Sequence, residues 1–192
     1  MQKFSDRLKK ESDFRKSNIF GKKGRFNFQT IKKVDFENGL KSKDLKNLNF
    51  INFAGDENES AYCLVKELYS FCLAGNYDFL NTLIIDDLDK GYKVDRLLDI
   101  ISNIQGKKYT SGDMTSIYKT RYQNHKELRI YIKRSRNNLS VILIDLYHLG
   151  IFSKVYENGK AKIIPLYKKY RRYQHNSVML DDLKKLKEIV WY

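Results

Sequence analysis

Hydrophobic positions along the chain change their spacing twice, and these changes predict where strands and helices lie. Apolar and polar residues alternate around Phe26 and Phe28, and again around Phe50 and Phe53. Alternation with a period of two is typical of strands, so a hairpin or a pair of short strands is expected there. Residues 1–24 are polar and charged and predict a basic arm.

A helical spacing of three and four residues follows in the middle of the chain. It predicts amphipathic helices over residues 61–72, 77–88 and 94–104, with Gly75 and Gly106 ending the first and the third. Carboxylates before residue 61 suit a helix N-terminus, where the helix dipole favours negative charge.

The period returns to two after Gly106 and predicts an antiparallel meander. Its strands are expected at residues 117–122, 128–133, 139–148, 152–156 and 160–166, followed by a closing helix on Leu180, Leu183 and Leu186. In the second of these strands the pleat places Arg129, Tyr131 and Lys133 along one surface of the sheet.

Together these elements predict an α+β fold, in which N-terminal strands and a helical block precede an antiparallel β-meander with a C-terminal helix. We divide the chain into a basic arm (1–24), an α/β region with an acidic helical block (25–105) and a basic, tyrosine-rich region (106–192). As an alternative, the last two regions form one domain.

Charge is distributed unevenly over these regions. The net charge of +14 is the sum of +8 over residues 1–50, −6 over residues 51–104 and +12 over residues 105–192. Nine of the 14 tyrosines lie in the last of these stretches, between Tyr109 and Tyr173. Cations interleaved with aromatic rings are typical of surfaces that hold phosphates and stack on bases, so nucleic acid is the partner to consider first.

Codon bias offers another explanation for this composition. A chain rich in Lys, Asn, Ile and Tyr is what an AT-rich genome encodes, with no nucleic-acid partner involved. The acidic middle third favours a partner, because codon bias alone should not spare one part of the chain. No apolar run reaches the length of a membrane span and the N-terminus lacks a signal sequence, so we expect a cytoplasmic protein without a membrane partner.

Three short sequences in the second half of the chain carry a resemblance to a known family. They are IYKTRY at residues 117–122, ELRIY at 127–131 and SKVY at 153–156, with an apolar strand before the last. In this order, after a helix, they resemble the RelE-type bacterial toxins, small ribonucleases that cleave messenger RNA, commonly on the ribosome. The resemblance covers about residues 93–160. It implies RNA as substrate and an antitoxin protein as a possible partner.

The resemblance also implies roles for single residues. Lys119 and Arg121 correspond to the family's phosphate-binding basic strand, Arg129 to the arginine that holds the scissile phosphate, and Tyr156 to the tyrosine near the 2′-hydroxyl. The arginine that the family has after its central strand is missing here. His148 stands at that place and is the substitute for a general acid.

The chemistry of metal-independent RNA cleavage fits these residue types. Cations must hold the charge that develops on the phosphate, and a side chain must move a proton near neutral pH. Arg129, Tyr156 and His148 are therefore the predicted catalytic residues, with no cofactor and no metal. The predicted nucleic-acid contacts are Lys107, Lys108, Lys119, Arg121, Tyr131, Lys133, Arg134, Arg136, Lys168, Lys169, Arg171, Arg172 and Tyr173.

Two hypotheses remain open at this point. One is a RelE-like endoribonuclease with about 90 additional N-terminal residues. The other is a non-catalytic phage or mobile-element protein that binds nucleic acid or a nucleoprotein complex, such as an inhibitor of a CRISPR-type host defence. The cluster of Asp86, Asp87 and Asp89 suggests a metal site, but we expect a solvated helix end, since neighbouring carboxylates on a helix point apart.

Overall fold

The computed structural model describes residues 30–88, 92–123, 125–151, 156–157, 160–161, 163–172 and 177–188. Contacts divide the chain into two compact units, Met1–Ile31 and Lys32–Tyr192. The basic arm expected over residues 1–24, with Phe26 and Phe28 after it, lies outside the described residues. The fold that follows is that of the second unit.

A five-stranded sheet forms the centre of this unit, in the order β1-β7-β6-β5-β4. Strands β4 to β7 pair antiparallel with their neighbours, whereas β1 runs parallel to β7. The sheet takes strands from both sides of residue 105, so the acidic and basic regions of the sequence share one core. The strands are β1 (Lys33–Asp35), β4 (Ile84–Asp87), β5 (Ile117–Arg121), β6 (Arg129–Ser135) and β7 (Asn138–Asp145).

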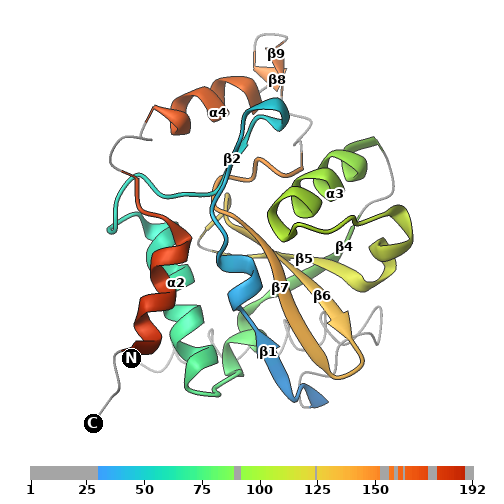
Figure 1. Ribbon diagram of the computed structural model, residues 1–192, viewed down its shortest axis with the longest axis vertical. Coiled ribbons are helices and arrows are strands. Elements are labelled where there is room, and N and C mark those ends of the chain that lie inside the picture. Colours follow the sequence, from blue (N-terminus) through green and yellow to red (C-terminus); the bar gives the residue numbers. More distant parts are fainter. Residues whose placement is uncertain are drawn as a thin grey trace, which may run out of the picture. The chain divides into compact units, whose positions relative to one another are not determined.

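Helices cover both faces of the sheet. Figure 1 shows α2 on one side of the strands and α3 on the other. Side chains on both faces of β6 are consequently buried, with Ile130 2%, Tyr131 0% and Ile132 2% exposed. The sheet is therefore an inner layer, and few of its side chains reach solvent except at the strand ends.

Two of the predicted helices are confirmed, because local spacing and end signals agree there. They are α2 (Ser60–Leu73) and α3 (Tyr92–Gln105). The glycines expected to end them, Gly75 and Gly106, both have a φ of 69°, a left-handed conformation that favours glycine.

The prediction of a helix over residues 77–88 is wrong. A short 3-10 helix, η4 (Asp78–Thr82), is followed by strand β4, which pairs antiparallel with β5. Ile84 and Ile85 are β-branched and complete the edge of the sheet, so pairing with β5 overrides the helical spacing of this short segment.

The part of the chain after β7 also differs from the prediction. Among the residues described there, Tyr156–Glu157 (β8) and Lys160–Ala161 (β9) pair as strands, and residues 163–166 belong to helix α4 (Ile163–Arg171) rather than to a strand. The strand expected at residues 152–156 lies mostly outside the described residues. Pro165 lies in the first turn of α4, where a missing N–H costs nothing. The closing helix is present as a 3-10 helix, η7 (Leu180–Glu188), packed against α2.

A small hairpin confirms the strands expected around Phe50. It pairs β2 (Asp44–Leu45), which is half-buried, with β3 (Phe50–Ile51), which is buried and contacts α4. Three short 3-10 helices complete the unit: η2 (Glu37–Leu40), η3 (Lys46–Leu48) and η5 (Ser111–Ser116). The fold is therefore α+β. No described helix has both the length and the apolar character of a membrane span.

Candidate functional site

Cationic side chains gather where β5 ends and β6 begins. Lys119 stands opposite Asp86 of β4 on one side and opposite Tyr131 of β6 on the other. Arg129 stands opposite Asp145 of β7. Because residues two apart in a strand share a face, Lys119, Arg121 and Arg129 leave the sheet on the same side. We call these three residues the strand-end cluster.

Arg129 is the buried member of the strand-end cluster. Its side chain is only 8% exposed, and Nη1 donates to the carbonyl oxygens of Lys126 (2.7 Å) and Leu128 (2.8 Å). Nε is buried and has no hydrogen-bond partner among the described residues. An unpaired buried donor costs about 1–3 kcal/mol, so this atom favours an arriving acceptor such as a phosphate oxygen.

His148 lies in the turn after β7, close to the strand-end cluster. Burial, followed by the positive charges of Arg129 and Lys119, lowers its pKa to about 4. Its imidazole is therefore neutral at pH 7 and free to accept a proton. Its φ of 56° is unusual for a residue with a β-carbon, so the turn holds it in a left-handed conformation.

Asp86 also belongs to this region, which corrects the expectation of a solvated helix end. It lies in β4 and binds Arg121, whose Nη2 donates to Oδ1 over 3.0 Å. One cation of the cluster is thus partly neutralised before any ligand arrives. Asp89 and the side chain of Asp87 lie outside the described residues.

Arg129, Tyr131 and Lys133 share one face of β6, as the alternation predicts, but α3 and η5 cover that face. Tyr131 is 0% exposed, and its hydroxyl has no hydrogen-bond partner among the described residues. Tyr131 is therefore no nucleic-acid contact in this conformation. Lys133 is half-buried and donates to Asp113 of η5 over 2.7 Å, which holds the pKa of Asp113 below its usual range.

A second group of predicted contacts lies at the opposite end of β6. Lys107 and Lys133 both lie over the ring of Tyr109, with Nζ 5.2 and 5.1 Å from its centroid. Arg134 and Arg136 flank the turn between β6 and β7, and Lys108 is exposed beside Lys107. At about 3.3 Å per residue of β6, Lys133 and Arg134 lie about 13 and 17 Å from Arg129.

Helix α4 carries the third group and contacts two residues that are close in sequence to His148 and Arg129. The ring of its Tyr170 stacks on Tyr147, with centroids 3.6 Å apart, and the Tyr170 hydroxyl donates to Glu127. Both contacted residues are chain neighbours of the site, since Tyr147 precedes His148 and Glu127 lies two residues before Arg129. The exposed cations of α4 are therefore near the cluster.

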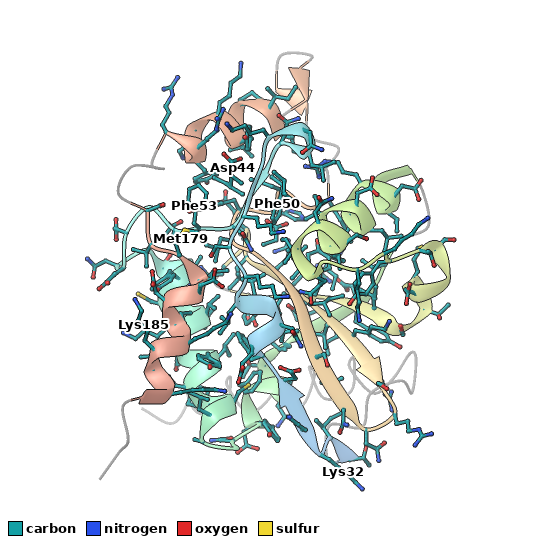
Figure 2. All side chains as sticks on the ribbon, in the orientation of Figure 1. Lys32, Asp44, Phe50, Phe53, Met179 and Lys185 are labelled. Atoms are coloured by element: carbon teal, nitrogen blue, oxygen red, sulfur yellow. The ribbon has the colours of Figure 1, made fainter. Side chains whose placement is uncertain are left out.

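The cations of α4 differ in how they are held. Lys168 and Lys169 of α4 and Arg172 just after it are exposed. Arg171 instead donates from Nε to Asp44 over 3.2 Å, and Tyr167 donates to the other oxygen of that carboxylate. Figure 2 shows Asp44 beneath α4, where it joins this helix to the β2–β3 hairpin. Arg171 is therefore a structural residue as well as a cation.

Two predicted residues are not placed in the site. Tyr156 begins β8, but its side chain lies outside the described residues, and Tyr173 lies outside them altogether. Two other residues were missed. Asp145 is 0% exposed at the end of β7, and Arg96 of α3 binds the turn that follows it. A carboxylate ending an apolar strand, five residues before Gly150, was the available signal for Asp145.

Comparisons with known proteins add no further assignment. No protein-family model, no curated protein and no solved structure matches the chain. The resemblance to the RelE-type toxins therefore stays a prediction. Within the residues that the structure describes, no group of three His, Cys, Asp or Glu side chains is placed to hold a metal ion.

Proposed function

We propose that this chain binds RNA and cleaves it without a metal ion, using Arg129 and His148. The observation that carries the proposal is a buried arginine, whose Nε has no hydrogen-bond partner among the described residues, together with an imidazole whose pKa burial and the charge of this arginine lower to about 4. A phosphate held by Arg129 places negative charge where the protein has concentrated positive charge. His148 is then the group that we propose takes up the proton.

The proposed reaction begins with the 2′-oxygen of the RNA. Neutral His148 accepts the 2′-hydroxyl proton, while Arg129 and Lys119 stabilise the charge that develops on the phosphate. The departing 5′-oxygen takes its proton from water or from the imidazolium formed in the first step. This assigns His148 the role of base, rather than the acid role that the resemblance implies, because its neutral form dominates at pH 7.

A bound phosphate should raise the pKa of His148. The positive charges of Arg129 and Lys119 contribute to the low pKa of the free imidazole. A phosphate anion beside them offsets these charges and raises the pKa towards neutrality, where general bases are most effective. Substrate binding would in this way prepare the base.

A non-catalytic binder is the second candidate, and the spread of the cations favours it. Arg134 lies about 17 Å from Arg129 along β6 by strand geometry, and Lys107, Lys108 and Arg136 lie around the same end of the strand. A single scissile phosphate does not need contacts at that distance, whereas a protein that grips a nucleic acid or nucleoprotein surface does. The same residues also serve a nuclease that binds several nucleotides.

The test is incubation of the purified chain with labelled RNA in EDTA, with and without ribosomes. We expect cleavage by the wild type, loss of cleavage in Arg129→Lys and unchanged cleavage in the control Lys66→Ala, which removes an exposed cation on α2. RNA binding without cleavage in every condition would leave the binder as the function. Absence of both binding and cleavage would overturn both candidates.

A further inference from the structure

The turn that carries His148 is built around one buried carboxylate. Asp145 is 0% exposed, and its oxygens accept the backbone N–H groups of Tyr147 (3.3 Å), Leu149 (2.8 Å) and Gly150 (2.6 Å). These three donors lie on both sides of His148 in the sequence. The carboxylate therefore fixes the path of the backbone through His148.

Arg96 of α3 holds the same turn through its carbonyl groups. Its Nη1 donates to the carbonyl oxygens of Leu149 (2.6 Å) and Gly150 (2.8 Å), and its Nε donates to that of Leu48 (3.1 Å). Asp145 thus accepts three N–H groups of the turn, and Arg96 donates to two of the turn's carbonyl groups. Hydrogen bonds to charged groups contribute about 1.5–3 kcal/mol each, so the turn is held firmly.

Gly150 packs closely against both the carboxylate and α3. A β-carbon added to Gly150 would lie 2.9 Å from Asp145 Oδ2 and 3.2 Å from Leu97 Cδ1. The first of these distances is too short for any real side chain. Gly150 is therefore required for the close approach of the turn to the carboxylate and to α3.

We infer that Asp145 and Arg96 are positioning residues for His148: they hold the turn so that the imidazole stays half-buried beside Arg129 and Lys119. The catalytic consequence rests on the proposed function, whereas the placement of His148 does not. Loss of either anchor lets the turn move outward. His148 then gains water and leaves the two cations.

The charged and titratable groups around Asp145 come from two elements besides its own. Arg96 faces it from α3, and Arg129 and Tyr131 face it from β6. Burial raises the pKa of Asp145 to about 6 against its three N–H bonds and the charge of Arg96. A buried carboxyl with this pKa gains a proton in mildly acidic solution, so its hydrogen bonds to the turn change from charged to neutral as the pH falls through about 6.

The experiment measures the pKa of His148 directly by NMR in the full chain with isotope-labelled histidine. Arg96→Lys and Gly150→Ala disturb the turn without changing its charge. In both variants we expect the pKa of His148 to rise from about 4 by at least one unit towards the ordinary 6.5. The control is Thr120→Val, which removes the buried hydroxyl bonded to Ile130 on the same sheet and should leave His148 unchanged.

The outcomes separate this inference from the proposed function. A His148 pKa that stays near 4 in folded Arg96→Lys and Gly150→Ala protein would overturn the inference, whether or not the wild type cleaves RNA. A rise in both variants supports it even if no cleavage is found. If Gly150→Ala does not fold, Arg96→Lys alone decides, because Lys keeps the charge and loses only the forked geometry.

Discussion

Replacing Asp145 by Asn should remove a pH-dependent part of the folding stability. The pKa of Asp145 is raised by burial from 3.8 to about 6 in the folded chain. The folded state therefore binds this proton more tightly than the unfolded state. The stabilising contribution is complete below about pH 4, the ordinary pKa of Asp, and is lost as the pH rises through 6.

The size of this contribution follows from the shift. Two pH units correspond to about 3 kcal/mol, since each unit is about 1.4 kcal/mol. Asn is neutral throughout, and it costs a fixed amount at every pH because its amide N–H₂ cannot accept from the turn. The free energy of unfolding of the wild type, minus that of Asp145→Asn, should therefore rise by about 3 kcal/mol from pH 7 to pH 4.

Urea unfolding at constant ionic strength between pH 4 and 7 measures this difference, and groups that both proteins share cancel from it. Asp113→Asn is a control of opposite sign, since bonds from Lys133 and Thr110 lower the pKa of Asp113. Its contribution is present at neutral pH and is lost as the pH falls. A wild-type-minus-Asp145→Asn difference that is flat, or that falls towards pH 4, would refute the assignment of Asp145 as a buried, ionised anchor.

Three other predictions concern nucleic acid. Asp86→Asn releases the guanidinium of Arg121 and should tighten RNA binding by about two- to five-fold at low salt, because exposed ion pairs are worth up to about 1 kcal/mol. Fluorescence anisotropy measures this change, and weaker binding would contradict it. Replacing Lys168, Lys169 and Arg172 together by Ala should flatten the slope of log affinity against log salt concentration by about 2. An unchanged slope would show that these three residues do not contact the nucleic acid. Arg129→Lys should reduce the rate of single-turnover cleavage by about 100-fold or more while RNA affinity changes only a few-fold, because a preorganised donor acts mainly on the transition state. Equal losses in binding and cleavage would contradict that role.

Local periodicity predicted the elements whose side chains repeat on one face. The helices over 61–72 and 94–104 and the three strands of the meander follow from spacing and from their end signals. The prediction of a helix around Ile84 and Ile85 was wrong, because a short apolar run fits a helix or a strand equally well. Pairing with β5 makes this segment a strand.

The candidate site was predictable in part for the same reason. Strand alternation places Arg129 and Tyr131 on one face, but it does not tell what covers that face, so the burial of Tyr131 beneath α3 was missed. Asp145 and Arg96 were missed because their partners are backbone groups of a turn. Such partners leave no side-chain pattern in the sequence.

In the proposed function, a phosphate of RNA binds between Arg129 and His148. The most direct measurement is the pKa of His148 by NMR with and without a saturating 2′-deoxy dinucleotide, which carries the phosphodiester but lacks the 2′-hydroxyl needed for cleavage. The account predicts that the pKa rises from about 4 by at least one unit on binding, because the bound anion offsets the charges of Arg129 and Lys119. An unchanged pKa of His148 at saturation would contradict the claim.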